Sequence, residues 1–361
     1  MNDTDYMKLA LELAKSTQGQ TSPNPMVGSV VVKDGAIVGM GAHLKAGEGH
    51  AEVQALTMAG EKARDATIYV TLEPCSHYGK TPPCADLIIE KGLRRVVVAT
   101  LDSNPAVAGR GLTRLKEAGI EVEFGVCQKE ANELNEVFFH FMKHQKPYVT
   151  LKSATTLDGK TATVTGKSKW ITGEEAREDV HRYRHIHDAI LVGIGTVLAD
   201  NPSLTTRLAR GGKNPIRVVL DRSLRIPIDA KLVQDQEAST WILTTEEASM
   251  EKQKDLEEYG IDVLRLPDDS IETVLALLGT KGITSLFVEG GAEVNGSFLK
   301  ARAVDQVITY LAPKLFGGKL APTAIGGGGF QEVEDAIELE IKEVTTIGKD
   351  IKIVSHVKGS E

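Results

Sequence analysis

The sequence predicts an α/β protein with two domains, and three observations support this prediction. At 361 residues the chain is longer than one hydrophobic core usually supports. Helical and β patterns alternate along both halves, as they do in layered α/β proteins. A long helical pattern ends at His144-Gln-Lys-Pro147, and a new strand pattern opens at Tyr148. We therefore expect one domain over residues 1–146 and a second over residues 147–361.

The first half is expected to begin with a helix and a β-hairpin. Residues 5–15 carry apolar side chains at helical spacing, and Pro23 and Pro25 break the chain after them. Two apolar runs, 26–33 and 36–43, are joined by Asp34-Gly35, which suits a tight turn. Beyond the hairpin, helices are expected over residues 50–60, from about residue 84, near 112–118 and over 129–142, and strands over residues 67–72, 95–100 and 121–125.

The second half alternates in the same way. Strands are expected over residues 148–154, 189–193, 216–220, 241–244, 285–289 and 306–310, with helices between several of them. Neither a repeat nor a long Gly/Ser linker separates the halves, so we expect them to pack closely or to share an interface in a homo-oligomer.

Composition limits the functional classes. Apolar residues make up 41% and charged residues 25% of the chain, as in globular domains, and the net charge is −8. An acidic balance argues against a nucleic-acid partner and favours a small-molecule substrate. No stretch approaches the ~20 apolar residues of a membrane span, and the N-terminus lacks a secretory signal pattern, so a cytoplasmic location without a membrane partner is expected. Three cysteines are too few for a disulfide framework.

Two of these cysteines belong to a predicted zinc site. His50-Ala-Glu52, Pro74-Cys75 and Pro83-Cys84 supply one imidazole and two thiolates. Three protein ligands leave tetrahedral Zn²⁺ one position for water, which is the arrangement of a catalytic site, whereas structural sites usually have four protein ligands. We predict that His50, Cys75 and Cys84 bind zinc. Cys127 has no His or Cys nearby in the sequence and is expected to be inert.

Glu52 is the predicted proton carrier. Residues i and i+2 of a helix lie ~200° apart, so His50 and Glu52 are expected to converge at a helix end. From there the carboxylate would move protons between the attacking water and the leaving ammonia. The pattern is typical of zinc nucleobase deaminases, which have two residues between the cysteines. Here eight residues separate Cys75 from Cys84, and this longer loop suggests an unusual substrate.

These motifs carry a family resemblance. Asn24-Pro-Met-Val-Gly28, His50-Ala-Glu52 and residues 71–84 together resemble the deaminase of the riboflavin pathway. The resemblance spans the first domain and implies a cytidine-deaminase-like, three-layer fold. It implies a substrate that is a diaminopyrimidinone with a ribosylamino phosphate, whose 2-amino group is replaced by an oxo group. The implied substrate contacts are Asn24, His43, His77 and Lys80.

A glycine-rich turn marks the second domain. Residues 285–297 have the pattern of an apolar strand, a Gly290-Gly291 turn and a helix. Glycine lets the backbone approach a phosphate, and the helix N-terminus offers N–H groups to it. The spacing differs from Gly-x-Gly-x-x-Gly, so the turn alone does not distinguish a nucleotide site from a structural turn.

Further motifs at residues 151–160, 168–172, 192–196 and 200–207 resemble the reductase half of the same bifunctional family. The resemblance then covers nearly the whole chain. It implies a dihydrofolate-reductase-like fold that transfers hydride from NADPH to the ribose of the deaminated product and opens it to a ribityl chain. The implied NADPH contacts are Ala154, Trp170, Thr196, Asp200, Gly291, Ala292, Glu293, Val294, Asn295, Gly296 and Ser297. The implied substrate contacts are Ser168, Arg184, Leu204, Arg207 and Glu289.

Some roles stay open at this point. Arg184 and Arg207 suit a phosphate clamp, because guanidinium groups match phosphate oxygens. Lys152 or Asp200 would be the catalytic proton donor for the reduction. Arg222 and Ser223 are possible contacts to the extra phosphate of NADPH. A last group is expected on a solvated helix face: Arg177, His181 and Arg182.

The resulting hypothesis is a two-step enzyme with the cofactors Zn²⁺ and NADPH. Residues 1–146 would deaminate a phosphorylated pyrimidine, and residues 147–361 would reduce its sugar. One alternative is a nucleoside or nucleic-acid deaminase whose second domain is an accessory nucleotide-binding module. Another is a non-enzymatic protein with structural zinc and a regulatory nucleotide site.

Overall fold

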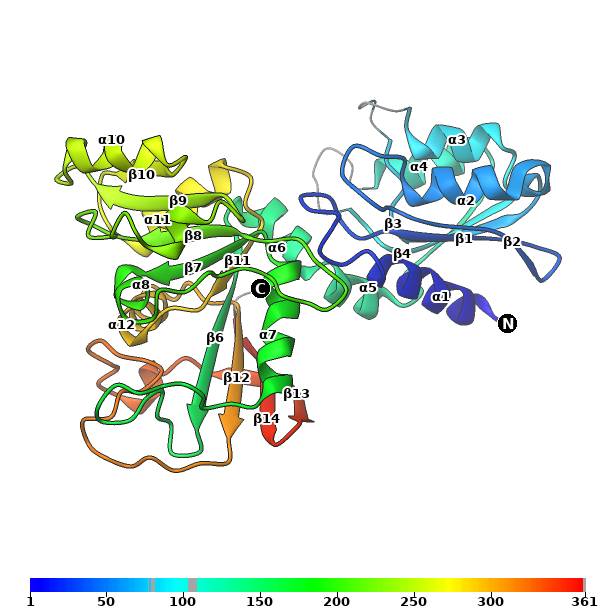
Figure 1. Ribbon diagram of the computed structural model, residues 1–361. Coiled ribbons are helices and arrows are strands. Elements are labelled where there is room, and N and C mark those ends of the chain that lie inside the picture. The colour runs from blue at the N-terminus through cyan, green and yellow to red at the C-terminus, as the bar shows by residue number, and fades with distance from the viewer. Residues whose placement is uncertain (77, 79–81, 103–108, 360–361) are drawn as a thin grey trace. The chain divides into compact units, whose positions relative to one another are not determined.

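Two separate sheets organise the chain (Figure 1). The computed structural model describes residues 1–76, 78, 82–102 and 109–359, which divide into the units Met1–Gln145 and Lys146–Glu361. Strands and helices alternate in both units, so the α/β class predicted from the sequence is confirmed. Within the described ranges, no helix is long and apolar enough to cross a membrane.

The first unit is a five-stranded sheet in the order β2-β1-β3-β4-β5. Its strands are β1 (Gly28–Lys33), β2 (Ala36–Ala42), β3 (Thr67–Leu72), β4 (Arg95–Thr100) and β5 (Glu121–Phe124). Its helices are α1 (Asp3–Lys15), α2 (Ala51–Ala59), the 3₁₀ turn η1 (Gly60–Ala63), α3 (Cys84–Glu90), α4 (Arg110–Glu117), α5 (Gln128–Leu134) and α6 (Glu136–His144).

Helices cover both faces of this sheet. Successive strand side chains point to opposite faces, so Val96 and Val98 of β4 pack with α2, α3 and α4, whereas Val97 and Ala99 pack with α1 and α5. The unit therefore has three layers. The single helix predicted over residues 129–142 is wrong in one respect, because Asn135 leaves helical geometry and divides it into α5 and α6.

Helix α2 lies directly on β2 because two glycines of that strand leave room for its backbone. A Cβ added at Gly41 would lie 2.4 Å from the Ala51 oxygen, and one at Gly39 would lie 2.1 Å from the Ala55 oxygen. Contact this close admits no side chain larger than hydrogen. The packing fixes the first turn of α2, where the predicted zinc-site residues begin.

The second unit is a nine-stranded sheet in the order β10-β9-β8-β7-β11-β6-β12-β14-β13. Its strands are β6 (Tyr148–Thr156), β7 (Ala189–Gly193), β8 (Ile216–Leu220), β9 (Thr240–Thr245), β10 (Asp262–Leu266), β11 (Ser285–Val288), β12 (Gln306–Ala312), β13 (Leu339–Ile347) and β14 (Asp350–Val357). Its helices are α7 (Glu174–Ile186), α8 (Ile194–Asp200), α9 (Lys231–Gln234), α10 (Met250–Glu258), α11 (Ile271–Thr280), α12 (Ala292–Lys300) and the 3₁₀ turn η2 (Val333–Asp335).

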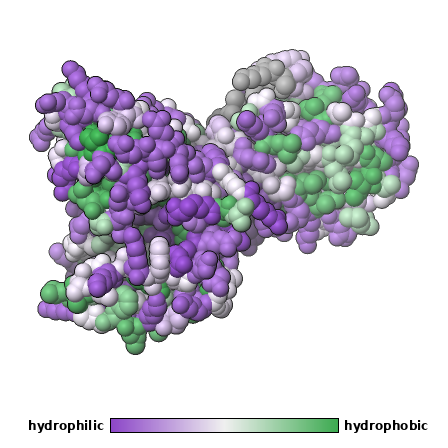
Figure 2. All heavy atoms as spheres, in the orientation of Figure 1, coloured by the Kyte–Doolittle hydropathy of each residue, from purple (hydrophilic) through white to green (hydrophobic). Residues whose placement is uncertain are grey.

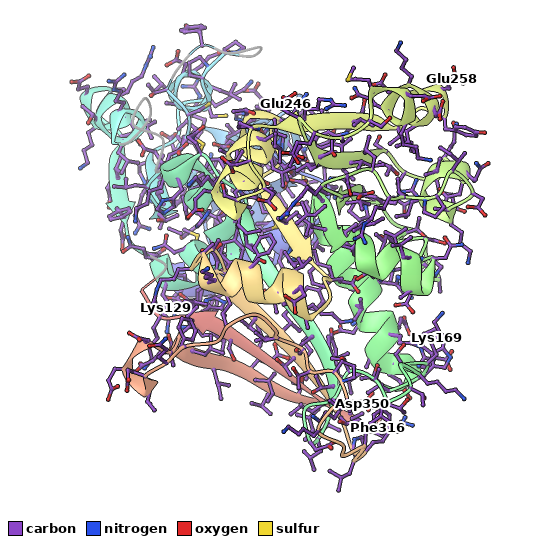
Figure 3. The ribbon with its side chains drawn as sticks, turned by 90° about the vertical axis from the view of Figure 1, so that its left-hand side faces the viewer. Lys129, Lys169, Glu246, Glu258, Phe316 and Asp350 are labelled. Atoms are coloured by element: carbon purple, nitrogen blue, oxygen red, sulfur yellow. The ribbon has the colours of Figure 1, made fainter. Side chains whose placement is uncertain are left out.

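Seven neighbouring strands of this sheet, from β10 to β12, run parallel, and β14 and β13 complete it as an antiparallel hairpin. Figure 3 shows this hairpin in red, with Asp350 at its turn. One apolar core lies between the sheet and α7, α8 and α10, and another lies under α11 and α12. Hydrophilic residues dominate the visible surface of the unit (Figure 2). The sequence did not predict β10, β13 or β14.

Candidate active sites

The first site is a cluster of three potential zinc ligands. The Nδ1 atom of His50 lies 3.6 Å from Cys75 Sγ and 3.3 Å from Cys84 Sγ. Ligand atoms of all three residues lie within 4.8 Å of one another. One imidazole and two thiolates at this spacing are a donor set that suits Zn²⁺. Among the described residues the cluster has three ligands, whereas a structural zinc site usually has four. The structure thus brings together the residues that the sequence singled out.

Two helix N-termini hold these ligands. His50 is the N-cap of α2, and Cys84 is the first residue of α3. The backbone N–H of Cys84 donates to Cys75 Sγ over 3.2 Å. Donation from Cys84 and His50 to this sulfur lowers the pKa of Cys75 to about 4, although burial opposes the shift, and the same contact with Cys75, together with burial, raises the pKa of Cys84. Cys75 is therefore a thiolate at neutral pH, the form that binds metal.

Glu52 is the second residue of α2, in its first turn, and is 3% exposed. Burial raises the pKa of Glu52 to about 7, and the nearby charge of His50 partly opposes the shift. A carboxyl group with a pKa near neutrality can both take up and release a proton. The position beside the ligand cluster and this pKa suit an acid–base role.

Asn24 and His43 lie beside the ligand cluster. The Nδ2 atom of Asn24 is 3.0 Å from His43 Nε2, and His43 Nδ1 is 3.4 Å from the Gly49 oxygen. Burial lowers the pKa of His43, so its imidazole is neutral and both ring nitrogens have protein partners. His43 therefore orients Asn24, which is the more accessible of the two. The other predicted substrate contacts, His77 and Lys80, lie outside the described residues.

Sequence reasoning missed Glu73, which anchors the segment before Cys75. Its side chain is 3% exposed and accepts hydrogen bonds from the N–H groups of Gly109 and Gly111, both 2.9 Å away. The carboxylate thus ties the start of α4 to the Pro74-Cys75 turn. An acidic residue between an apolar strand and Pro-Cys was the available signal for this role.

The second site surrounds Glu289, at the carboxyl end of β11. Arg184 of α7 donates to both oxygens of Glu289, through Nε at 2.7 Å and Nη2 at 3.2 Å. Lys152 of β6 places Nζ 3.5 Å from Glu289 Oε2. Burial alone would raise the pKa of Glu289, but Arg184 and Lys152 lower it to about 2. Glu289 is ionised at neutral pH and holds both cations in place.

Arg207 and His181 complete this cluster. Burial and the nearby charge of Arg184 lower the pKa of Arg207, which still leaves its guanidinium charged. Burial, then Arg184 and Arg207, lower the pKa of His181 to about 4, so its imidazole is neutral. Lys152, Arg184 and Arg207 outnumber the nearby carboxylates Glu289 and Glu237, and this excess of positive charge suits an anionic phosphate group. Arg184, Arg207 and Lys152 thus lie near one carboxylate, and Glu289 occupies one side of Arg184.

The turn at Gly290-Gly291 faces a second helix start. Gly291 is the N-cap of α12 and Gly193 is the N-cap of α8, and these helices follow the neighbouring parallel strands β11 and β7. A Cβ on Gly193 would lie 2.7 Å from Val294, and one on Gly291 would lie 3.7 Å from Thr196 Oγ1. Two helix N-termini at the carboxyl edge of a parallel sheet suit a phosphate-containing cofactor.

Not every residue of the predicted 291–297 stretch faces this edge. Asn295 is 2% exposed and donates from Nδ2 to the Ala324 oxygen over 2.8 Å. Gly296 packs against Gly326, because a Cβ added to Gly296 would lie 2.4 Å from the backbone oxygen of Gly326. Ser297 donates within the helix to the Glu293 oxygen. The accessible part of the stretch is its first turn, because the later residues hold α12 in the fold.

Trp170 is 63% exposed, and the Arg177 guanidinium lies 4.5 Å from its ring centroid. Arg177 also donates to the Thr172 oxygen over 2.7 Å, so it supports this segment rather than facing only solvent. His181 likewise has a buried Nδ1, whereas the Arg182 side chain is 67% exposed. The solvated-face prediction is therefore wrong for Arg177 and His181, because α7 presents these residues to neighbouring segments.

The remaining predicted residues lie on several different segments of the second unit. Asp200 is the exposed last residue of α8, and Leu204 is buried with φ +53°. Arg222 pairs with Asp269 at the surface, and Ser223 beside it is exposed. Ala154 packs partly against the core under α7, and Ser168 is half-buried.

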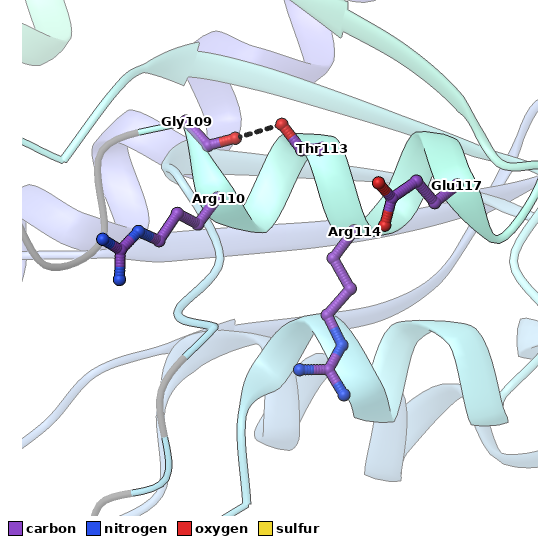
Figure 4. A pocket seen from close by; sticks show the side chains of 5 residues that line it. All are labelled: Gly109, Arg110, Thr113, Arg114 and Glu117. Carbon is purple, nitrogen blue, oxygen red and sulfur yellow. Dashed lines mark hydrogen bonds between the residues drawn. The ribbon is translucent and has the colours of Figure 1, made fainter.

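A shallow depression on α4 is separate from both sites. Figure 4 shows its described lining on one helix, with Arg114 directed away toward α3, where it pairs with Asp86 over 2.6 Å. The lining residues are Gly109, Arg110, Thr113, Arg114 and Glu117. None of them belongs to the predicted sites, so this surface adds nothing to the functional argument.

Comparison with known families divides the chain in the same way. Residues 1–100 match the cytidine and deoxycytidylate deaminase zinc-binding region, and residues 147–353 match the RibD C-terminal domain. The riboflavin biosynthesis protein RibD of Bacillus amyloliquefaciens is 54% identical over 98% of this chain and 96% of its own length. That of Escherichia coli K12 is 43% identical, and the alignment covers 100% of both chains.

Solved structures agree along the whole chain. Acinetobacter baumannii RibD, form 1, is 40% identical, with a TM-score of 0.90 over 99% of both chains. A Thermotoga maritima protein has a TM-score of 0.87, 39% identity and 98% coverage of both chains. It is described as a diaminohydroxyphosphoribosylaminopyrimidine deaminase/5-amino-6-(5-phosphoribosylamino)uracil reductase. These matches confirm the predicted pair of folds, cytidine-deaminase-like and dihydrofolate-reductase-like.

Proposed function

The chain belongs to the RibD family of bifunctional riboflavin-biosynthesis proteins, and from this premise we propose which residues carry out its two reactions. It is a zinc-dependent deaminase joined to an NADPH-dependent reductase, as the hypothesis from the sequence stated. The nucleic-acid deaminase and the non-enzymatic alternatives are not supported. We propose the substrates named for the Thermotoga maritima relative: a diaminohydroxyphosphoribosylaminopyrimidine, then 5-amino-6-(5-phosphoribosylamino)uracil.

The observation that carries the deaminase assignment is the cluster of His50, Cys75 and Cys84 with Glu52 beside it. Zinc held by these three ligands would supply Lewis-acid activation of the attacking water. Glu52 takes a proton from that water while the water oxygen forms a bond to the 2-carbon of the pyrimidine. The carboxyl group then gives the proton to the amino group, and the C–N bond breaks to release ammonia. Asn24, held by His43, offers an amide donor and acceptor to the ring.

In the reductase, bound NADPH would supply a hydride to the 1′-carbon of the ribose. The bond from that carbon to the ring oxygen breaks, and the oxygen needs a proton. Of the two candidate donors, Lys152 belongs to the charged cluster, whereas Asp200 lies on the surface at the end of α8. We propose Lys152 as the donor. Glu289 holds its ammonium group, while Arg184 and Arg207 bind the phosphate.

The test of the deaminase proposal is Glu52→Gln in the full-length protein. The substitution keeps the shape of the side chain and removes its ability to carry a proton. Ammonia release should fall by about 100-fold or more, while zinc content and NADPH oxidation with the deaminated substrate stay at wild-type levels. Wild-type ammonia release from a variant with full zinc content would refute the role of Glu52.

We also propose a homo-oligomer, with β13 at the interface. All but the last residue of this strand are exposed, and among the described strands it pairs with β14 alone. Its side chains include Ile341 (61% exposed) and Val344 (59% exposed), and an exposed apolar edge is a surface that another chain can cover. Sedimentation of wild type and Ile341→Lys tests this: a wild type that sediments as a monomer would contradict it. The cytoplasmic location stays a prediction from the sequence.

A further inference from the structure

We propose that Asn135 is a positioning residue for the deaminase, which holds the segment carrying Asn24 against the zinc site. This inference rests on the proposed function, because it takes Asn24 as a contact to the substrate. Asn135 lies between α5 and α6, 109 residues away from Met26 in the chain. No sequence motif singled it out.

The side chain of Asn135 pairs with the backbone of Met26 in both directions. The Met26 N–H donates to Asn135 Oδ1 over 2.8 Å, and Asn135 Nδ2 donates to the Met26 oxygen over 2.9 Å. Asn135 is 2% exposed. A buried pair of this kind orders the backbone it contacts, since breaking it would leave polar groups without partners.

The segment needs an external anchor because of its own sequence. Pro23 and Pro25 have no N–H, so between residues 23 and 26 only Asn24 and Met26 can donate from the backbone. The Asn24 N–H donates locally to the Thr21 oxygen over 2.9 Å. Met26 therefore carries the backbone N–H of this stretch that is left for a distant partner, and Asn135 bonds to both of its backbone groups.

From Met26 a short series of contacts leads through His43 to His50, one of the predicted zinc ligands. The next residue, Val27, accepts from the backbone N–H of His43 over 2.9 Å. Asn24, two residues before Met26, reaches His43 Nε2 over 3.0 Å through its Nδ2 atom. The His43 ring meets the His50 ring edge-on, with centroids 5.5 Å apart. Movement of Met26 would therefore displace Asn24 relative to His50.

Asn135 is itself fixed by the two helices that it joins. The backbone N–H of Asn135 donates to the backbone oxygen of Ala131 in α5 over 3.3 Å. The backbone oxygen of Asn135 accepts from the backbone N–H of Phe139 in α6 over 3.0 Å. Only an amide offers a donor and an acceptor side by side at this reach. An Asp of the same shape would place a carboxylate oxygen against the Met26 oxygen and repel it.

The first test compares Asn135→Asp and Asn135→Ala with wild type in the full-length, zinc-loaded enzyme. If Asn135 acts through Asn24, both variants raise the deaminase KM by about tenfold, the effect of losing a buried hydrogen bond, and leave kcat within about twofold. Zinc content and the reductase activity of the same protein stay unchanged. Asn132→Asp is the matched control, since Asn132 lies one turn earlier on α5, is exposed, and keeps an acceptor for Thr100.

A double-mutant cycle separates this inference from the proposed function. Adding Asn135→Ala to Asn24→Ala should change the KM little beyond the effect of Asn24→Ala alone, because both substitutions remove the same contact. Additive effects, or a loss of kcat together with zinc, would make Asn135 merely structural and overturn the inference. If Asn24→Ala raises the KM and the Asn135 variants do not, the inference alone fails. An unchanged KM in Asn24→Ala refutes the proposed substrate contact, and this inference with it.

Discussion

At the scale of single residues, charge decides what the reductase site can do. Glu289 is 11% exposed, and a carboxylate this far from water is stable only beside positive charge. Arg184 makes a bidentate contact with the Glu289 carboxylate, and Lys152 makes a single contact with it at 3.5 Å. The bidentate pair fixes geometry, whereas the looser ammonium group is free to move a proton.

The first prediction concerns this ammonium group. Lys152→Met should lower kcat for NADPH oxidation by about 100-fold or more, because the departing ring oxygen loses its proton donor. Asp200→Asn is the comparison and should change kcat much less, since Asp200 lies on the surface at the end of α8. Single-turnover oxidation of NADPH with the deaminated substrate measures both. A larger loss in Asp200→Asn would reverse the assignment of the donor.

The second prediction follows from the pKa of Glu289. That pKa falls from an ordinary 4.5 to about 2, so the folded state favours the ionised form. The contribution, about 3 kcal/mol, is present above pH ~4.5 and is lost as the pH falls toward 2. Urea unfolding at pH 7, 5, 4 and 3 should show Glu289→Gln less stable than wild type by a constant amount down to pH 5. Below pH 5 the difference should shrink, and a constant difference down to pH 3 would contradict this account.

Residues that do chemistry were easier to predict from the sequence than residues that support them. The combination of His50, Cys75 and Cys84 is rare without a metal, and the structure places these three together with Glu52 beside them. The supporting partners Glu73 and Asn135 bond to backbone groups far away in the chain, as Asn135 does across 109 residues. The sequence does not show which groups pair in this way, because the partner is a peptide group that every residue has.

At the scale of elements, the contact between α2 and β2 sets the zinc site. The third prediction is that Gly41→Ala lowers zinc affinity and destabilises the first unit by roughly 1–3 kcal/mol. The added Cβ would lie 2.4 Å from the Ala51 oxygen and 2.7 Å from Gln54 Cβ, so the first turn of α2 must move, and His50 with it. Competition with a chromogenic zinc chelator measures the affinity.

Gly49→Ala is the control for this element. Gly49 precedes His50 directly, yet its added Cβ would meet only Val53, at 3.7 Å, which is ordinary contact. This variant should bind zinc like wild type. Equal losses in the two variants would show that glycine flexibility, rather than the approach of α2 to β2, controls the site.

The boundaries of helices and strands could be predicted where a local hydrophobic pattern sets them. The prediction was wrong where contacts with distant parts of the chain set them. The strands over residues 67–72 and 95–100 fold as predicted, because each is a buried apolar run. The break at Asn135 follows no helix-breaking signal and coincides with its bonds to Met26. The edge strand β13 escaped prediction because its side chains are exposed on both faces and its short apolar alternation is interrupted at the register shift between Ile341 and Glu343.

At the scale of the whole molecule, each unit has its own apolar cores. In the described parts of the chain, two clusters draw their buried residues from residues 6–131 and two from residues 149–354. Zinc ligands occur in the first unit, and the Glu289 cluster lies in the second. Stability and activity should therefore separate between the units when zinc is removed.

The last prediction uses a strong chelator on the full-length protein. Ammonia release should stop, because His50, Cys75 and Cys84 lose the ion that activates water. Removing a ligand that binds only the folded state lowers the stability of the unit that holds it, so one calorimetric transition should move to lower temperature. NADPH oxidation with the deaminated substrate should continue, and the transition of the second unit should stay in place, because its cores contain no zinc ligand. Readdition of zinc should restore both losses. A parallel decline of NADPH oxidation would mean that the reductase depends on the zinc-loaded fold of the first unit, and the independence inferred from the separate cores would be refuted.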